Sequence, residues 1–193
     1  METRISMMSI RDLLDDMASD RVRLLDERKQ VDVTVGAAIA VLDALQRGAP
    51  LGMLTITEHW ADNLPMKVIA DGAVRMAVLA GAFLPSTSRP AWAPDWLANY
   101  AYTGLGTDRV GVGLVDPDDP RQLPTQAMLR TRDFMVWERR LGTIASTDML
   151  GGILKAAHDL TATIYAIMPA AVVAGGSPEE LRQTAAQANA RLP

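Results

Sequence analysis

The amino-acid sequence predicts an α/β (α+β) protein with a small mixed sheet and a helical C-terminal third. Short apolar segments typical of strands alternate with amphipathic helical patterns over residues 9–84. A Pro- and Ser-rich connection follows, and apolar residues then recur at helical spacing. At 193 residues the chain has the size of one ordinary domain. We expect that domain to span 1–193, with a core at 9–84, a connection at 85–120 and a helical part at 121–193.

The composition restricts the class of protein. Nearly half of the residues are apolar and 22% are charged, which is typical of a globular chain. The net charge of −4 argues against broad, non-specific nucleic-acid binding. The absence of cysteine excludes disulfides, thiolate metal sites and cysteine nucleophiles. Because there is no signal-peptide pattern and no bilayer-length apolar run, we expect no membrane contact. The expected location is the cytoplasm, or a particle assembled there.

Two helices are predicted in the first 50 residues. Ser9 is a suitable N-cap for the first helix. The segment 21–25 is typical of a short strand, and the charged segment 26–30 is typical of a solvated loop. The second helix begins near Thr34 and ends at Gly48, where a left-handed C-terminal residue is expected. The two apolar stripes are Ile10, Leu13, Leu14 and Met17 in the first helix, and Val35, Ile39, Leu42 and Leu45 in the second.

The segment 68–83 is the one on which the functional predictions depend. After a strand at 51–58 and a second apolar strand at 66–70, the chain turns at Asp71-Gly72 and a helix starts at once. Asp71 is a good N-cap, Gly72 permits close approach of the backbone, and a helix N-terminus attracts anions. Arg75 lies four residues after Asp71 on the same helix face. These features suit phosphate binding. The alternative is a capping residue with an i,i+4 ion pair, worth about 0.3–0.5 kcal/mol.

Residues 85–120 are predicted to form loops and one strand, at 110–115. The aromatic residues Trp92, Trp96 and Tyr100 could stack on nucleic-acid bases, but we favour a loop folded back on the core. The segment 104–106, Gly-Leu-Gly, lacks the third glycine of a dinucleotide-binding loop and is predicted to be a turn. The three carboxylates of 116–120 lack the ligand spacing of a metal site, which predicts a solvated turn.

The final third contains the strongest periodic signal. One apolar stripe is Phe134, Trp137 and Leu141, and a longer one is Met149, Ile153, Ala157, Leu160 and Ile164. A strand-like run follows at 167–174, and a last helix opens at 177–180 with a capping box. The only histidines, His59 and His158, show no metal-site spacing, and His158 is expected at a helix surface or boundary. We therefore expect no metal site.

Two segments carry a resemblance to a known family. Residues 42–52 read Leu-Asp-Ala-Leu-Gln-Arg-Gly-Ala-Pro-Leu-Gly, and residues 71–75 read Asp-Gly-Ala-Val-Arg. The first is similar to the signature Leu-x-Ser-Ile-x-x-Gly-x-Pro-Ile-Gly, and the second occupies the place of an Asp-Gly-Gln-Gln-Arg motif. These two motifs are typical of the N-terminal domain of the GmrSD-type restriction proteins, a large family related to ParB and sulfiredoxin, which this chain therefore resembles. Further counterparts lie at 9–14, 23–26, 123–124 and 177–189, so the resemblance covers almost the whole chain.

That resemblance implies an α/β fold on a ParB/sulfiredoxin-like core. In family members the Asp-Gly-Gln-Gln-Arg loop is tied to nucleotide hydrolysis or nicking, in defence against foreign DNA. By position, Asp71 would be the catalytic acid or metal-facing group, Arg75 the phosphate clamp, and Gly72 the point of close approach. Arg28 or Lys29 would substitute for the arginine of the family's Phe-Gln-Arg segment. An active member would use a nucleotide with Mg²⁺.

Departures from the family pattern lead us to expect a domain without catalysis. Ala73 and Val74 replace two glutamines, and methyl groups can neither orient a water nor contact phosphate as amides do. Loss of such preorganised groups costs orders of magnitude in rate. We therefore predict a degenerate member without a cofactor that binds a protein partner or a second copy of itself. It would be a binding or structural component of a phage-encoded particle or a defence complex.

Two other functions stay open at this point. An active nucleotide hydrolase or DNA nuclease would use the Asp71-Gly72-x-x-Arg75 loop, and its turnover would be abolished by Asp71→Ala. A nucleic-acid adaptor would use the cations Arg21, Arg23, Arg28 and Lys29, and its DNA affinity would fall with salt.

Overall fold

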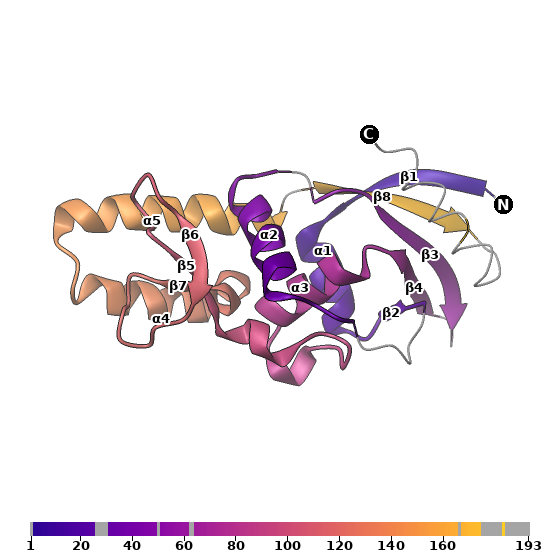
Figure 1. Ribbon diagram of the computed structural model, residues 1–193, viewed down its shortest axis with the longest axis horizontal. Coiled ribbons are helices and arrows are strands. Elements are labelled where there is room, and N and C mark those ends of the chain that lie inside the picture. Colours follow the sequence, from indigo (N-terminus) through magenta and orange to yellow (C-terminus); the bar gives the residue numbers. More distant parts are fainter. Residues whose placement is uncertain are drawn as a thin grey trace.

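The protein is a mixed α/β structure, as predicted. The computed structural model describes residues 2–25, 31–49, 51–61, 64–165, 167–174 and 183. Within them, a five-stranded sheet has the order β1-β8-β3-β4-β2, and a three-stranded sheet has the order β6-β5-β7. Figure 1 shows the larger sheet at one end of the molecule, α4 and α5 at the other, and α2 and α3 between them.

The N-terminal strand is the main element that the sequence patterns missed. β1 (Glu2–Ser9) pairs antiparallel with β8 (Ile167–Ala174), a strand from the far end of the chain. α1 (Ile10–Ala18) follows without a break, and its predicted cap is confirmed because the Ser9 hydroxyl accepts a hydrogen bond from the Asp12 amide at 3.0 Å. The whole predicted stripe of α1 is buried.

Three predicted strands form the rest of the larger sheet. β2 (Val22–Leu24) runs parallel to β4 (Leu64–Asp71). β3 (Leu54–Ala61) pairs antiparallel with β4 and parallel with β8. This combination of directions makes the sheet mixed. β3 starts three residues later than predicted, and both hairpin strands extend further into the segment between them than the polar composition there indicated.

The second helix has the predicted ends but a different buried face. α2 (Val35–Gln46) is capped by the Thr34 hydroxyl, which accepts from the Ala37 amide at 3.2 Å, and Gly48 has the left-handed φ of +62°. Its buried residues are Ala38, Leu42 and Leu45. Val35 and Ile39 were predicted to be in the stripe but are 55% and 38% exposed. The small Ala38 allows close packing, and this rotates the apolar face.

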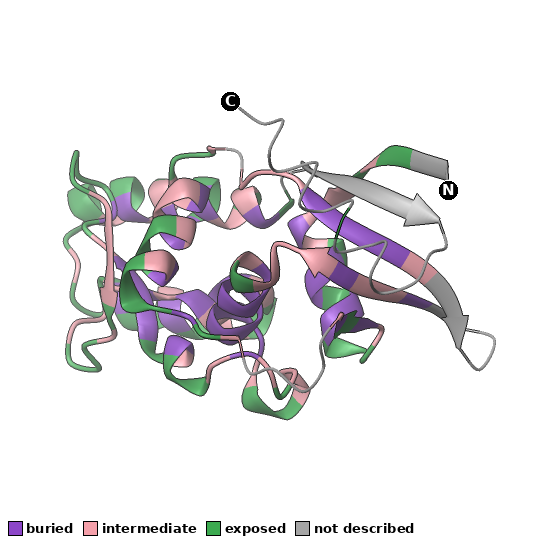
Figure 2. Ribbon diagram, turned by 45° about the vertical axis from the view of Figure 1, so that its right-hand side comes forward, coloured by how far each residue is buried: buried purple, intermediate pink, exposed green. Residues whose placement is uncertain are grey.

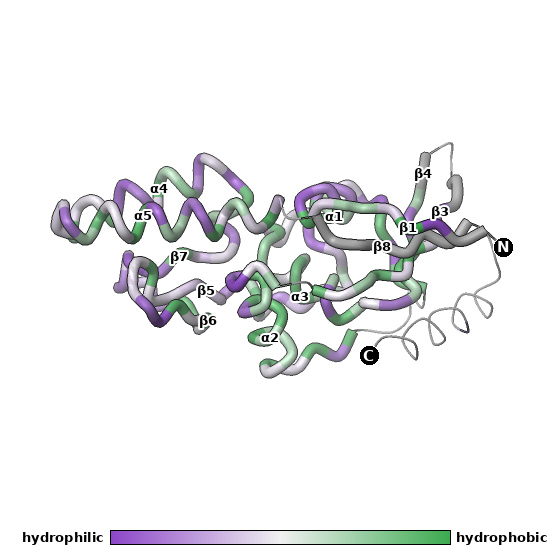
Figure 3. The backbone as a smooth tube through the Cα atoms, turned by 90° about the horizontal axis from the view of Figure 1, so that it is seen from above, coloured by the Kyte–Doolittle hydropathy of each residue, from purple (hydrophilic) through white to green (hydrophobic). Residues whose placement is uncertain are grey.

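The centre of the core is α3 (Ala73–Phe83), in which every residue from Met76 onward is buried. A helix that is apolar on all sides needs neighbours all round, and here α1, α2 and the loop after α3 provide them. Figure 2 shows this helix as a largely buried element, and Figure 3 shows α2 and α3 as hydrophobic over much of their length.

The connection after α3 folds back on the core, as we favoured. It forms η1 (Ser86–Ser88) and η2 (Asp95–Asn99) and then the smaller sheet, made of β5 (Tyr100–Thr103), β6 (Gly111–Leu114) and β7 (Leu123–Pro124). Leu97 and Tyr100 are buried, and the Trp96 and Tyr100 rings meet edge to face with centroids 5.7 Å apart. The predicted turn at 104–106 is confirmed by positive φ at both glycines.

The helical end of the molecule is built as predicted except at one residue. η3 (Thr125–Leu129) leads to α4 (Thr131–Gly142), and α5 (Thr147–Ala162) ends in η4 (Thr163–Tyr165). Both predicted stripes are buried apart from Met149, which is 53% exposed because it lies in the first turn of α5, near the tip of the helical hairpin. His158 is exposed, as predicted. The opening of the predicted last helix, at 177–180, lies outside the described residues.

No helix in the described part of the chain combines the length and apolarity needed to cross a membrane.

Candidate functional site

The predicted phosphate loop lies at the junction of β4 and α3. Asp71 is the last residue of β4, and α3 begins at Ala73. Asp71 is not the N-cap that we predicted. The cap position belongs to Gly72, whose φ of +92° is left-handed, and no side chain bonds to the first turn. The Asp71 carboxylate instead lies 3.4 Å from Nη2 of Arg75, which satisfies the i,i+4 ion-pair alternative.

The Arg75 guanidinium binds the main chain of a different segment. Its Nη1 donates to the carbonyl of Leu51 at 2.6 Å, and its Nη2 donates to the carbonyl of Met53 at 2.8 Å. Leu51 and Met53 precede β3 in the sequence, so Arg75 fastens the start of α3 to the entry of β3. The Arg75 side chain is 23% exposed and the Asp71 side chain 28%.

Two left-handed glycines make room for this guanidinium. Gly52 has a φ of +83°, and a Cβ there would overlap Nη1 of Arg75. At Gly72 a Cβ would overlap the Leu54 side chain and come within 3.0 Å of Nη2 of Arg75. The structure therefore brings together the ends of the two segments, 42–52 and 71–75, that carry the family resemblance. The sequence pattern contained both glycines and the arginine but did not indicate that they meet.

This arrangement limits what Arg75 can bind. Bidentate recognition of a phosphate needs two parallel N–H groups of the guanidinium fork. Both Nη atoms of Arg75 already donate to carbonyl oxygens, and Nη2 also faces Asp71. Arg75 and Asp71 together carry no net charge. The junction is therefore a satisfied internal contact between two chain segments.

Other arginines are used in the same way. Arg11 donates to the carbonyl of Leu129 at 2.9 Å, and Arg140 donates to that of Pro117 at 3.0 Å. The Arg89 side chain is only 3% exposed and donates to the carbonyl of Leu84 at 2.8 Å. A guanidinium suits this task because its several N–H groups point in fixed directions. Arg75 is thus one of several described arginines that bind main-chain carbonyls.

The cations proposed for nucleic-acid binding fall into two groups. Arg21 is ion-paired with Asp16 at 2.7 Å, and Lys67 pairs with the same carboxylate. Arg23 lies 4.0 Å from Asp20. Arg28 and Lys29 lie outside the described residues. The two described cations of this set both have carboxylate neighbours, which reduces the positive charge available to a phosphate backbone.

No described group of three or more His, Asp or Glu side chains is arranged to hold a metal ion. The carboxylates of the predicted turn at 116–120 bind groups of the same loop. The Asp116 carboxylate accepts from the Asp118 amide at 3.0 Å, and Asp119 pairs with Arg121 at 2.8 Å. The hydrogen bond from the Arg121 side chain lowers the pKa of Asp119.

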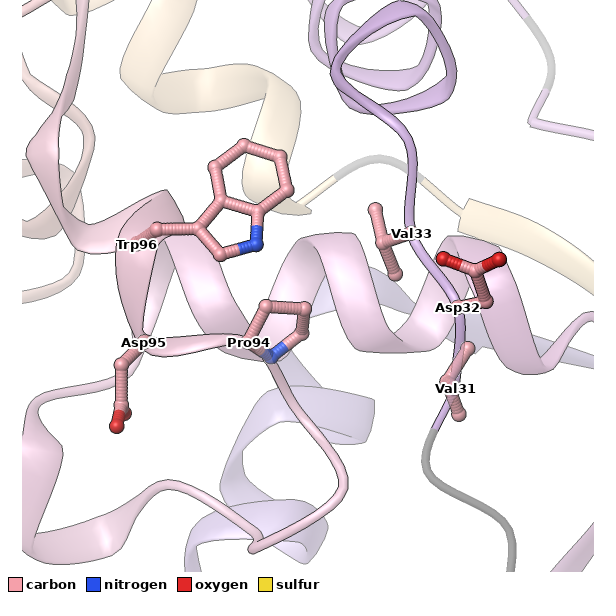
Figure 4. A pocket seen from close by; sticks show the side chains of 6 residues that line it. All are labelled: Val31, Asp32, Val33, Pro94, Asp95 and Trp96. Carbon is pink, nitrogen blue, oxygen red and sulfur yellow. The ribbon is translucent and has the colours of Figure 1, made fainter.

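A groove of about 610 Å³ lies between the segment before α2 and the start of η2. Figure 4 shows the Trp96 indole projecting from one side toward Val33 on the other. Trp96 is 36% exposed, and Asp95 pairs with Arg89 at 2.8 Å. Among the described residues that line the groove, two are carboxylates and none is a cation. Its lining residues are Val31, Asp32, Val33, Pro94, Asp95 and Trp96.

The sequence matches no protein-family model and no curated protein. Function therefore has to be argued from the residues of the site.

Proposed function

We propose that this protein is a non-catalytic binding or structural component of a larger assembly. The observation that carries the proposal is the state of Arg75, whose two Nη atoms are held by the carbonyls of Leu51 and Met53. The one arginine in the loop that resembles a nucleotide-processing motif is thereby part of the folded framework. It joins α3 to the entry of β3.

The energies involved oppose recruitment of Arg75 by a phosphate. A hydrogen bond to a charged group contributes about 1.5–3 kcal/mol, so a phosphate that displaced both carbonyls from the two Nη atoms would have to offset about 3–6 kcal/mol. A bidentate phosphate contact would return a similar amount, which leaves little net gain for binding. Each 1.4 kcal/mol of such a deficit weakens affinity about tenfold.

The neighbouring residues give no substitute chemistry. Ala73 and Val74 begin α3, and Val74 is 38% exposed, so the surface at the helix start presents hydrocarbon. The Asp71 carboxylate is engaged in the 3.4 Å ion pair with Arg75. The described helix start therefore has no side-chain amide and no cation outside an ion pair, and only the backbone N–H groups of its first turn remain to stabilise a developing charge.

The proposed role is binding to another protein or to a second copy of this chain, in the cytoplasm or in a particle assembled there. The resemblance to restriction-type proteins supports a setting in a defence complex or a phage-encoded particle. Exposed apolar side chains support a protein partner, since such residues favour burial in an interface.

A thermal-shift series tests this proposal. GTP with Mg²⁺, ATP with Mg²⁺ and a short DNA duplex are each added to wild-type protein and to Arg75→Ala. A ligand present at 100 times its Kd stabilises a protein by about 2.7 kcal/mol, which raises the Tm by about 5–10 °C at this chain length. We expect no shift with any of the three. A shift of that size in the wild type, lost in Arg75→Ala relative to its own baseline, would overturn the proposal.

A further inference from the structure

The edge of the larger sheet at β1 has the features of an interface strand. β1 is eight residues long, and its register with β8 is regular over all eight pairs. Within the described residues, β8 is its only partner, so the main-chain groups along its other edge have no strand partner in that part of the chain. Edge strands template the addition of another strand unless they are short, bulged, charged or interrupted by proline. β1 has no proline, lysine, glycine or bulge.

The outward side chains of this edge are apolar. Ile5 is 69% exposed and Met7 is 61% exposed, and they share one face of the strand because they are two residues apart. On the opposite face of the strand, Met8 packs against the core. Arg4 is on the same face as Met8, but its side chain is 68% exposed and is paired with Glu58 of β3 at 3.2 Å. The only cation of β1 is therefore already neutralised within its own sheet.

We propose that two copies of this chain join through β1, edge to edge and antiparallel, to make one continuous sheet. This inference rests on the proposed binding role and names its partner. A second copy offers a strand of equal length with the same alternation of side chains, which the short or glycine-containing edges β2, β7 and β6 do not. The two-fold axis passes between the Ser6 residues of the two copies.

This register is self-complementary. Ser6 faces Ser6 of the second copy, and Ile5 faces Met7 of the second copy on the outer face. The four apolar side chains form one cross-strand cluster, in which directly opposed residues have Cβ atoms about 4.5–5.5 Å apart. Arg4 faces Met8 of the second copy, so no like charges meet. The two-fold axis makes the Ile5–Met7 and Arg4–Met8 contacts each occur twice, and the Ser6–Ser6 contact, on the axis, once.

The test uses mass and crosslinking. Light scattering on wild-type protein over a concentration series should show a mass rising from 20.8 kDa toward twice that value. Ile5→Lys should keep the protein a monomer, since it places two lysines in the apolar cluster. Leu114→Lys is the matched control, because Leu114 is an equally exposed apolar residue (67%) on β6, an edge strand of the other sheet. It should leave the dimer unchanged.

A single introduced cysteine reports the register, because the chain has none of its own. Opposed residues at a β1–β1 contact have Cα separations of about 4.5–5.5 Å, within the range that a disulfide spans. Ser6→Cys should therefore give a covalent dimer on mild oxidation, and Ser86→Cys, in the exposed η1 turn, should not. Crosslinking through Ile5→Cys in place of Ser6→Cys would overturn the register.

A wild-type protein that is monomeric throughout, or a dimer unaffected by Ile5→Lys, would overturn the proposed interface. Neither result bears on catalysis. A monomer without nucleotide turnover contradicts only the β1 dimer, and a dimer that hydrolyses nucleotide contradicts only the non-catalytic role.

Discussion

Replacing Arg75 with alanine should destabilise the protein strongly, because the contact it makes is structural. The substitution removes two charged hydrogen bonds, to the carbonyls of Leu51 and Met53 at 2.6 and 2.8 Å, and a 3.4 Å ion pair with Asp71. Because the site is partly exposed, we take about 1.5 kcal/mol for each hydrogen bond, the low end of the range for charged groups, so the two bonds contribute about 3 kcal/mol. The ion pair adds about 0.5 kcal/mol, after allowance for solvent screening.

We therefore expect Arg75→Ala to lower the free energy of unfolding by about 3.5 kcal/mol and the Tm by about 7–14 °C. Urea denaturation with global fitting gives the free energy, and calorimetry gives the Tm. Arg75→Lys should lose about half as much, since a single ammonium cannot match the two-pronged geometry of the guanidinium.

The matched control is Arg132→Ala, which removes an exposed arginine from α4. Substitutions at such positions change stability by about 0.5 kcal/mol or less. If Arg75→Ala were no more destabilising than Arg132→Ala, the guanidinium would not hold the two segments together. The reasoning that it is unavailable to a phosphate would then be refuted.

Three further predictions concern glycine, tyrosine and the loop after α3. Gly72→Ala should lower the unfolding free energy by about 2–4 kcal/mol, because a Cβ at φ +92° is strained and overlaps the Leu54 side chain. The control Gly36→Ala, in the open first turn of α2, should be neutral or stabilising by up to about 1 kcal/mol. Equal effects of the two substitutions in urea melts would contradict the packing at Gly72. Burial raises the pKa of the Tyr102 hydroxyl above its ordinary 10.0, with the charge of Asp43 adding to this. The stability from keeping Tyr102 protonated is thus complete below pH 10 and falls above it, by up to about 1.4 kcal/mol per pH unit. Melts from pH 9 to 12 should show a smaller alkaline loss in Tyr102→Phe than in wild type, and parallel curves would exclude this cause. Arg89→Ala should lower the unfolding free energy by about 2–3 kcal/mol, since it removes a 3%-exposed side chain that donates to the Leu84 carbonyl. Asp95→Ala should lower it by less than about 1 kcal/mol, because that carboxylate is 93% exposed. The opposite order in denaturant melts would show that the contact of Arg89 with Asp95 matters more than its contact with the Leu84 carbonyl.

Local patterns predicted much of the fold. Ser9 and Thr34 cap the helices that they were expected to cap, and the stripe Phe134, Trp137 and Leu141 is buried. Such features depend on neighbours within one or two turns, which a sequence displays directly. β1 was missed because its pairing partner is β8, at the other end of the chain. Ile39 was misassigned because tertiary packing selects which side of an apolar helix is buried.

At the candidate site, the sequence located the residues but not their relation. The i,i+4 pair of Asp71 and Arg75 follows from helix spacing and is present. The bonds from Arg75 to the carbonyls of Leu51 and Met53 cross from one segment to another, and no local pattern encodes such a contact. The cap at Gly72 was assigned to Asp71 because side-chain chemistry favours aspartate, whereas the backbone turn at this strand end requires a left-handed residue.

The central claim is that Arg75 and Asp71 hold the fold together and do no chemistry. The most direct test measures GTP and ATP hydrolysis, with Mg²⁺ present, by purified wild-type protein and by Asp71→Ala. We predict that both give the same background rate. Turnover by the wild type that disappears in Asp71→Ala, while the variant stays folded by circular dichroism, would contradict the claim.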